Sequence, residues 1–600
     1  MGGGFETKTA QPIENAPTKI DDPHENSRPE YRSSVGSNRK FSIKSGNLRC
    51  LDAGSENQNL AAAGLRSRGR TLRGNVRKKQ MSSTNRYIVL VALTVAFGGF
   101  LMGFDASVIS GVVGFIEPEF SLSKLQVGWA VSCLTLTATL GMLISGPLSD
   151  VIGRKKVLIL SAVVYAVSAI LSAVATSFWF LVIARMIGGF GVGASLIIAP
   201  MYIAEIAPAA MRGRMVSFNQ LNIVIGISAA FFSNFLVLKL GKSDAGWAQA
   251  LQFGPHNWRW MLGLETFPAL LYFFSLFAVP ESPRWLILRG RNDEALETMA
   301  RAVGPDEAQA QVQTIKASIA SEAGREKTPF SELFMPAMRR VLLIGLVIGI
   351  VQQITGINAV FFYAPMIFQQ SGIGTDAAFS QAVVVGLINL VFTVVAIGLV
   401  DKLGRKPLLA FGLAGIALSM LLLGSGFKSA TYQLSAQSLE KLPPGVDAAK
   451  LAPLQDQLYR SDVDFKNAIK LALGDSQATQ FEADLIANAI RVNPKLILIG
   501  ILGFVASFAM SVGPVMWVLF SELFPNRVRG LAISFVGLVN SAVSFVVQLV
   551  FPWELANWGS ALTFFIYGGF AAVGLVFVLM VLPETKGRTL EELESLLVRK

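Results

Sequence analysis

Cysteine, histidine and charge are all scarce in this sequence. Its 600 residues contain two cysteines, Cys50 and Cys133, and two histidines, His24 and His256, too few for a disulfide framework or a His/Cys metal site. It also lacks a glycine-rich nucleotide loop ending in Lys and Ser or Thr, which argues against an ATP-driven pump. Charged residues make up 15% of the chain and hydrophobic residues 52%, whereas in a soluble domain about a quarter of the residues are charged. We therefore predict a polytopic membrane protein.

Twelve hydrophobic spans account for this composition, and each is long enough to cross a ~30 Å hydrocarbon layer. They lie at residues 87–111, 127–147, 157–176, 178–202, 215–238, 260–280, 341–369, 379–400, 407–426, 496–520, 531–551 and 560–582. Basic clusters occupy alternate loops, so the positive-inside rule predicts that both termini are cytoplasmic. We expect a multi-pass protein of the cell (inner) membrane.

Two motifs recur along the chain and indicate internal duplication. The D-x-x-G-R-K motif that starts at Asp150 recurs at Asp401, 251 residues later, while Glu205 corresponds to Glu522, 317 residues later. The fold class predicted is an all-α membrane protein with twelve transmembrane helices in two six-helix pseudo-repeats. Because the second offset is larger, the second repeat must contain an insertion, and only the polar stretch 428–495 can supply it.

The predicted domain organisation follows from the spans and the polar stretches between them. The domains are a disordered basic cytoplasmic tail (1–86), an N-terminal six-helix bundle (87–280), a cytoplasmic helical linker (281–340), a C-terminal six-helix bundle (341–582) with an extracytoplasmic insertion (428–495), and a cytoplasmic C-terminal tail (583–600). The N-terminal tail holds 16 Lys/Arg against 8 Asp/Glu, so most of the net charge of +12 lies there. This favours contact with anionic lipid rather than nucleic acid. The insertion is either a small helical cap or a connector without function.

Three charged side chains lie inside the twelve spans: Asp105 in the first, Arg185 in the fourth and Glu265 in the sixth. Helix rise places all three ~7–11 Å below the outer boundary, so they can share one depth. A carboxylate inside a membrane costs roughly 2.5–3.5 kcal/mol to insert and needs a partner or a function. We predict that Asp105 pairs with Arg185 and couples proton uptake to a conformational change; the alternative is a permanent ion pair that fixes helix packing. For Glu265, nearer to the interface, a structural role is expected.

Uncharged amides form a second polar set, centred on span seven. They are Gln352, Gln353 and Asn358 in span seven, Gln220 and Asn222 in span five, Asn389 in span eight and Asn540 in span eleven. Gly356 and Pro365 flank an expected break in span seven, and interrupted helices mark binding sites in transporters. Amides donate and accept hydrogen bonds, which suits a neutral polyhydroxylated ligand; hydrogen bonding between helices is the alternative for any one amide. Trp517 in span ten either stacks on a sugar ring or packs against other helices.

Several motifs together resemble the sugar porter family of the major facilitator superfamily. They are GRKK (153–156), RMIGGFGVG (185–193), PMYIAEIAPAAMRG (200–213), PESPRWL (280–286), QQITGIN (352–358), GRKP (404–407) and PETKGRTLEEL (583–593). The resemblance covers about residues 85–582 except the insertion. It implies a major facilitator fold, in which two six-helix bundles rock about a central site.

The resemblance also implies roles for individual residues. By this resemblance, the residues expected to contact the sugar are Gln220, Gln352, Gln353, Asn358, Asn389, Trp517 and Asn540. The resemblance also implies a cytoplasmic gate that holds the outward-open state. Its expected residues are Asp150, Arg154, Glu205, Arg212, Glu281, Arg284, Asp401, Arg405, Glu522, Arg529 and Glu584. Paired charges at helix ends can form a bistable latch of this kind.

Within the family, the chain most resembles bacterial proton:xylose-type symporters, which have an aspartate and an arginine matching Asp105 and Arg185. It departs from them where Ile227 replaces a second span-five glutamine, Ser541 replaces a common tryptophan and Val151 replaces the usual arginine of the first loop motif. The predicted function is import of a neutral monosaccharide or polyol with a proton, by a monomer without cofactors or enzymatic activity. A facilitative uniporter and a non-transporting sugar sensor are the alternatives.

Overall fold

The structure, a computed structural model, describes residues 55–208, 211–323, 329–440, 442, 445–525, 527–588 and 592–594. The chain divides into two units, Met1–Arg73 and Gly74–Lys600; α1 begins in the first unit, and the second holds all twelve candidate membrane spans of the described residues. Twelve of its described helices are long and apolar enough to cross a membrane, which confirms the predicted number of spans.

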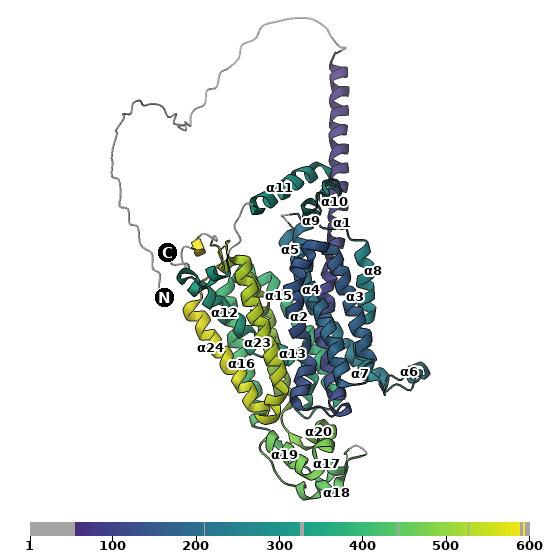
Figure 1. Cartoon of the computed structure of the whole chain (residues 1–600), viewed down its shortest axis with the longest axis vertical. Helices are drawn as coiled ribbons and strands as arrows, with labels where there is room; N and C mark the ends of the chain where they lie inside the picture. The colour runs from purple at the N-terminus through teal and green to yellow at the C-terminus, as the bar shows by residue number, and fades with distance from the viewer. Residues whose placement is uncertain are drawn as a thin grey trace, which may run out of the picture. The chain divides into compact units, whose positions relative to one another are not determined.

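The first six spans form the N-half (Figure 1). Its helices are α1 (Ser55–Glu119, whose span is Arg86–Glu119), α2 (Lys124–Ile152), α3 (Arg154–Ala173), α4 (Phe178–Ile206), α5 (Arg212–Gly241), α6 (Gly246–Ala250), α7 (Asn257–Gly263) and α8 (Thr266–Phe277). Side-chain caps fix where two of them begin. Ser123 forms a capping box with Gln126 at the start of α2, and Ser177 accepts a hydrogen bond from the backbone N–H of Phe180 in α4.

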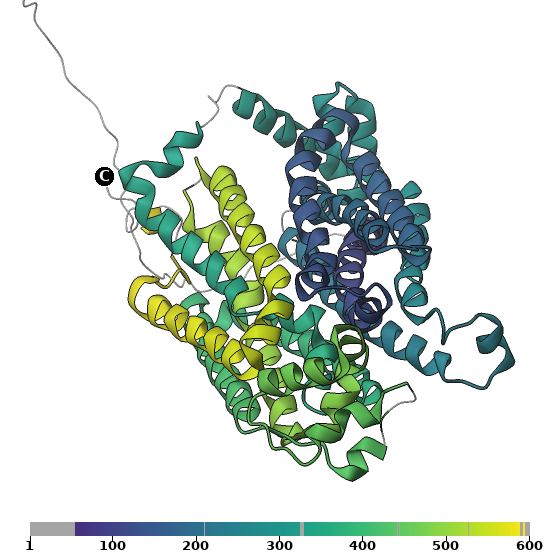
Figure 2. The same cartoon turned by 60° about the horizontal axis from the view of Figure 1, so that its bottom comes forward.

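The last six spans form the C-half. Its helices are α12 (Arg339–Ile354), α13 (Ile357–Phe362), α14 (Ala364–Gln369), α15 (Thr375–Leu403), α16 (Arg405–Lys428), α21 (Pro494–Met510), α22 (Val512–Leu523), α23 (Arg529–Asn557) and α24 (Gly559–Val581). Figure 2 shows the N-half and the C-half as two separate groups of helices. We call the interface between them the seam.

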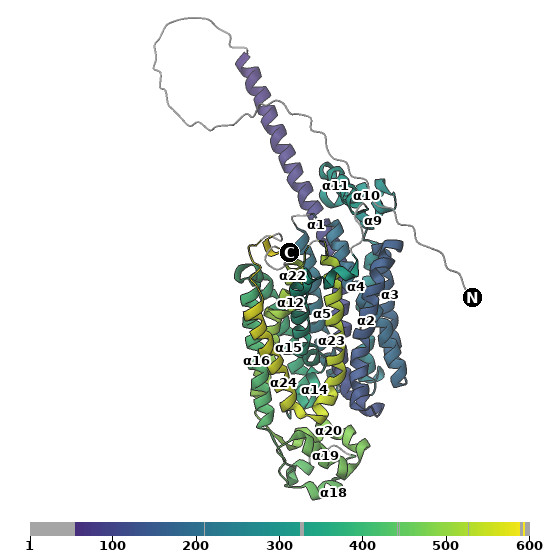
Figure 3. The ribbon, with the colours of Figure 1, turned by 60° about the vertical axis from the view of Figure 1, so that its left-hand side comes forward.

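Two smaller helical segments lie at opposite ends of the bundles (Figures 1 and 3). The linker holds α9 (Pro283–Leu288), α10 (Asn292–Val303), α11 (Pro305–Ala323), η1 (Phe330–Phe334) and η2 (Pro336–Met338). The insertion holds β1 (Thr431–Tyr432), α17 (Ala436–Glu440), α18 (Ala448–Leu451), η3 (Ala452–Leu454), α19 (Asp462–Leu473), α20 (Asp475–Ala489) and β2 (Ile490–Arg491), with β1 and β2 antiparallel. We call residues 430–492 the cap and name the two ends of the bundles the cap end and the basic end.

The apolar core is continuous across the seam only toward the cap end. One cluster joins the C-half to cap-end residues of the N-half such as Val112, Val127 and Phe231. A second cluster holds residues of the N-half nearer the basic end, such as Leu158 and Ile203. Burial of apolar surface therefore ties the halves together at the cap end, while the N-half has a core of its own at the basic end.

Candidate functional site

A buried ion pair lies inside the N-half. Asp105 of α1 and Arg185 of α4 approach to 3.6 Å between Oδ1 and Nη1, and their side chains are 3% and 1% exposed. Arg185 Nε also donates to the backbone oxygen of Ala130 in α2, at 3.1 Å. An added Cβ at Gly188 would lie 3.0 Å from Asp105 Oδ2, so the glycine leaves room for the carboxylate. Asp105 and Arg185, which helix rise predicted to lie at the same depth in the membrane, thus face one another.

This pair is not saturated with hydrogen bonds. Asp105 Oδ2 and Arg185 Nη2 are both buried without a partner in the described part of the chain. Glu265, the N-cap residue of α8, is also buried, leaves Oε1 without a partner, and interacts electrostatically with both members of the pair. Buried polar atoms are normally satisfied, so these unpaired atoms distinguish the three ionisable side chains from the rest of the packed core.

The amides of span seven gather at a break in the helix. α12 ends at Ile354, Gly356 adopts φ 89°, and the chain restarts as α13, as the sequence predicted. A side chain at Gly356 would collide with the ring of Tyr567 as well as being strained at positive φ. The break turns Gln352, Gln353 and Asn358 toward α23.

Asn540 of α23 joins these amides into one hydrogen-bonded cluster. Its Nδ2 donates to Gln352 Oε1 at 2.8 Å, and its Oδ1 accepts from Gln353 Nε2 at 3.1 Å. Asn358 Nδ2 donates to Gln353 Oε1 at 2.9 Å. Four of the seven residues predicted to contact sugar therefore meet, and no charged residue is among them.

The cluster extends along α23 through residues that sequence reasoning missed. Asn358 Nδ2 also donates to Ser544 Oγ at 2.7 Å, and Ser544 accepts from Gln548 Nε2 at 2.8 Å. Gln548 Oε1 accepts from the hydroxyl of Thr135 in α2, at 2.9 Å, which carries the hydrogen bonds across the seam. The spacing of four residues between Asn540, Ser544 and Gln548 was the available signal, since such residues share a helix face.

The other three predicted sugar contacts lie outside this cluster. Gln220 of α5 is partly buried, and Asn389 of α15 is buried. Trp517 of α22 is 45% exposed and packs edge-on against Phe520. No hydrogen bond among the described residues joins Gln220 or Asn389 to the amides of span seven.

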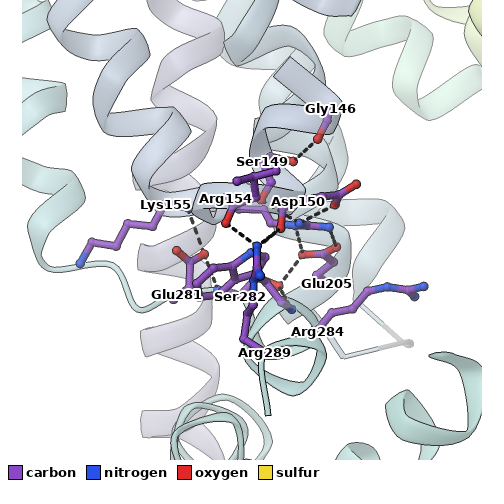
Figure 4. A network of polar contacts seen from close by, with 12 residues as sticks. Gly146, Ser149, Asp150, Arg154, Lys155, Glu205, Glu281, Ser282, Arg284 and Arg289 are labelled. Carbon is purple, nitrogen blue, oxygen red and sulfur yellow. Dashed lines mark hydrogen bonds and ion pairs between the residues drawn. The ribbon is translucent and has the colours of Figure 1, made fainter. Parts of the chain in front are cut away.

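At the basic end of the N-half, Arg154 is the centre of a polar network (Figure 4). Its guanidinium makes two 3.1 Å hydrogen bonds to Glu205 and a 2.8 Å ion pair with Asp150. Glu281 accepts from the backbone N–H of Lys155 at 3.1 Å, and Ser282 donates to Glu205. These contacts fasten the end of span six and the start of the linker to the α2–α3 turn.

The C-half repeats this network at its own basic end. Arg405 donates to Glu522 at 3.1 and 2.7 Å and pairs with Asp401 at 3.1 Å, while Glu584 accepts from the backbone N–H of Arg405 at 3.0 Å. The hydroxyl of Thr585 donates to Glu522 at 2.7 Å, in the place that Ser282 takes in the N-half. The duplicated motifs thus form duplicated structures.

Glycine is required at both of these turns. Gly153 and Gly404 have φ of 103° and 94°, a region that other residues rarely adopt. A Cβ at either position would collide with the carboxylate of Glu281 or Glu584, respectively. Each glycine therefore lets a carboxylate cap the helix that starts with Arg154 or Arg405.

The remaining predicted gate residues take no part in these two networks. Arg284 pairs with Glu322 of the linker at 2.5 Å. Arg529 donates from Nε to the backbone oxygen of Phe524, and its buried Nη2 has no partner in the described part of the chain. Arg212 is exposed at the start of α5, with no ion pair to another described residue.

The seam is closed at the cap end. The carbonyl of Leu549 in α23 leaves no space for a side chain on Gly128 of α2, near the cap end. Nearer the middle of the helices, Ser228 of α5 donates to the backbone oxygen of Gly386 in α15 at 2.8 Å. At the basic end, the ion pairs between described residues stay within one half or within the linker segment attached to it. Among the described residues, the ion pairs that join the two halves therefore lie at the cap end.

Fold and site define a class of protein. Two pseudo-symmetric six-span halves, an uncharged amide cluster at a helix break and a seam closed at one end are the features of a multi-pass membrane transporter. No group of three or more His, Cys, Asp or Glu residues suited to a metal ion occurs in the described part of the chain.

Comparison with known proteins identifies the family. Residues 91–441 and 479–597 match the sequence model of the sugar (and other) transporter family, so the chain belongs to it. The arabinose-proton symporter of Bacillus subtilis (strain 168) is 33% identical over 514 residues, covering 86% of this chain and 96% of the relative. The D-xylose-proton symporter of Escherichia coli (strain K12) is 34% identical over 542 residues, covering 85% of this chain and 96% of the relative.

Solved structures agree with this assignment. The xylose transporter XylE from E. coli in a partially occluded inward-open conformation matches with a TM-score of 0.64 at 32% identity, over 84% of this chain and all of that one. The proton:xylose symporter XylE bound to 6-bromo-6-deoxy-D-glucose matches with a TM-score of 0.62 at 33% identity, over 86% of this chain and all of that one. The predicted sugar porter family and major facilitator fold are confirmed.

Proposed function

We propose that this protein imports a neutral monosaccharide or polyol together with a proton, by alternating access across the cell membrane. The basic end and both termini face the cytoplasm in this proposal, as the basic clusters in alternate loops suggest. The observation that carries the proton coupling is the buried Asp105–Arg185 pair, because a facilitator needs no carboxylate at that depth.

The amide cluster supports the choice of a neutral ligand. Gln352, Gln353, Asn358 and Asn540 offer donors and acceptors but no net charge, and their hydrogen bonds to one another can be exchanged for bonds to hydroxyl groups. An anion or a cation would lack a counter-charge there. Gln220, Asn389 and Trp517 complete the proposed contacts when the halves close around the sugar.

Proton coupling follows from the competition between Arg185 and a proton for Asp105. While ionised, Asp105 is held by Arg185; when it takes a proton, the attraction is lost and α1 can move relative to α4. In this scheme the protonated form favours the conformation open to the outside, and bound sugar favours the occluded one. Each ligand shifts the conformational equilibrium by the difference between its affinities for the two conformations. Sugar and proton then cross together.

The two networks at the basic end act as the gate. Arg154 with Glu205, and Arg405 with Glu522, hold each half rigid in the conformation seen here. Arg212 and Arg529 stand at the starts of the corresponding helices α5 and α23, where they can pair with carboxylates of the opposite half when the basic end closes.

Transport by purified protein in proteoliposomes tests this function. With the outside one pH unit more acidic than the inside, the protein should accumulate a labelled pentose, hexose or inositol, and a competition panel should identify the preferred one. Uptake that stops at equal concentrations despite the pH gradient would indicate a uniporter. Sugar binding without uptake would indicate a sensor.

A further inference from the structure

We propose that the cap is a latch across the seam, in which Glu482 of the cap and Lys124 of the N-half hold the cap end closed. The latch would favour the conformation open at the basic end and would have to break in each transport cycle. This inference rests on the alternating access proposed above. The match to the family model skips residues 442–478, so much of the cap is an addition of this chain to the family pattern.

The cap is a folded unit rather than a loose connector. It has its own apolar core, in which Leu434, Phe465 and Leu485 are completely buried. Tyr432 of β1 stacks on Phe465 of α19 with ring centroids 5.4 Å apart. A unit with its own core can transmit force between the elements that it touches, which a flexible chain cannot.

The cap is fastened to the C-half. Asp462 at the start of α19 accepts hydrogen bonds from the backbone N–H of Ser560 at 2.9 Å and from its hydroxyl at 3.2 Å, at the beginning of α24. Glu482 of α20 also accepts from Gln370, which follows α14, at 3.4 Å. The cap should therefore move with the C-half.

The contact with the N-half is a chain of alternating charges. Lys124, the first residue of α2, pairs with Glu117 of α1 at 2.6 Å and with Glu482 of the cap at 2.9 Å. Glu482 in turn lies 3.6 Å from Lys466 of α19. Each charge thus has an opposite charge beside it.

Partial burial makes the Glu482–Lys124 pair stronger than an ordinary surface pair. The two side chains are 18% and 20% exposed, whereas the Lys242–Asp376 pair, which also crosses the seam, has side chains 58% and 40% exposed. Exposed pairs contribute little because water and salt screen them. Burial raises the pKa of Glu482, but Lys124 and Lys466 outweigh it and lower that pKa to about 2, so Glu482 stays ionised at physiological pH.

The direction of the effect follows from where the pair lies. Opening the cap end as the halves rock must separate α2 of the N-half from the cap, which the C-half carries. The pair therefore stabilises only the conformation closed at the cap end, and removing it shifts the conformational equilibrium by the same free energy. A coupling of this kind corresponds to a change on the order of fivefold to thirtyfold in the ratio of the two conformations.

Glu482→Gln is the direct test, because glutamine keeps the shape and can still accept from Gln370. Lys124 keeps Glu117 and Lys466 keeps Asp462 as partners, so the variant should fold. The matched control is Asp475→Asn, which removes a carboxylate that pairs only within the cap, with Lys470, and is 89% exposed.

The readout is the distance between the halves at the basic end. Spin labels at Gly213→Cys and Gly530→Cys, where an added Cβ meets no atom within 4 Å, report this distance by pulsed electron resonance in a Cys50→Ser background; the buried Cys133 stays unlabelled. Glu482→Gln should raise the short-distance population relative to the long one by fivefold to thirtyfold, and Asp475→Asn should leave it unchanged.

The proposal is overturned if Glu482→Gln leaves the distance distribution as it is, or if Asp475→Asn shifts it equally. A second experiment joins Glu482→Cys to Lys124→Cys with a short bifunctional thiosulfonate, which should stop sugar exchange until a reductant is added. Exchange that continues at full rate in the cross-linked protein would also overturn it. Because the distance measurement needs no sugar, its result is independent of whether the protein transports.

Discussion

Replacing Asp105 by asparagine should uncouple sugar movement from the proton while leaving the sugar pathway in place. Asp105 Oδ1 and Arg185 Nη1 are 3.6 Å apart and almost completely buried. At an effective dielectric constant of about 20, two unit charges at this distance attract by roughly 5 kcal/mol. Asparagine abolishes that attraction permanently, as protonation would do transiently in the cycle that we propose.

The expected loss can be calculated from the driving force. With one proton carried per sugar, an inward gradient of one pH unit supports about tenfold accumulation, because both correspond to about 1.4 kcal/mol. Asp105→Asn should lower this ratio to one. Counterflow exchange of labelled for unlabelled sugar should persist, since it requires movement of the loaded protein but no net proton transfer.

Counterflow also serves as the test of folding, because breaking a buried pair costs 3–5 kcal/mol of stability in typical cases. Asp376→Asn, which removes a carboxylate from an exposed pair, is the matched control and should keep full accumulation. Undiminished accumulation by Asp105→Asn would refute the assignment of the proton site. Loss of both accumulation and counterflow in a folded protein would show that Asp105 shapes the pathway itself.

Three further predictions concern other parts of the molecule. Gln353→Ala should raise the KM for sugar by about 5- to 150-fold, since an unsatisfied buried polar group costs ~1–3 kcal/mol, and titration of initial rates with sugar measures this. Gly356→Ala should lower the melting temperature, because φ 89° and the ring of Tyr567 both oppose a side chain, and an unchanged value would contradict the observed break. Arg405→Ala should destabilise the protein by ~1–3 kcal/mol and slow transport. Its control, Arg284→Ala, removes a more exposed ion pair and should lower the stability by less than about 1 kcal/mol. Equal effects of the two substitutions would argue against a special role for the Arg405 network.

The sequence predicted the features that depend on local composition. The spans follow from hydropathy, since each needs about 20 apolar residues whatever its neighbours are. The Asp105–Arg185 pair could be predicted because so few charges occur inside the spans, and helix rise alone brings these two to one depth. The break at Gly356 could be predicted from glycine and proline near a row of amides.

Features that depend on packing between distant segments could not be predicted in this way. Their spacing places Ser544 and Gln548 on the helix face of Asn540, but which residues they contact is known only once α23 is placed against α13 and α2. The insertion 428–495 holds eight basic and eight acidic residues, and this balance gave no sign that Glu482 would meet Lys124, 358 positions away. Likewise, the motifs identified Arg154 and Arg405, but only the folded structure shows that each network stays within its own half.

Sugar-induced proton movement tests the central claim most directly. Sugar added to weakly buffered cells that express the protein should make the medium more alkaline, with one proton taken up per sugar molecule, and Asp105→Asn should abolish the signal. Sugar uptake at the normal rate without any alkalinisation would contradict proton symport and leave facilitated diffusion as the function.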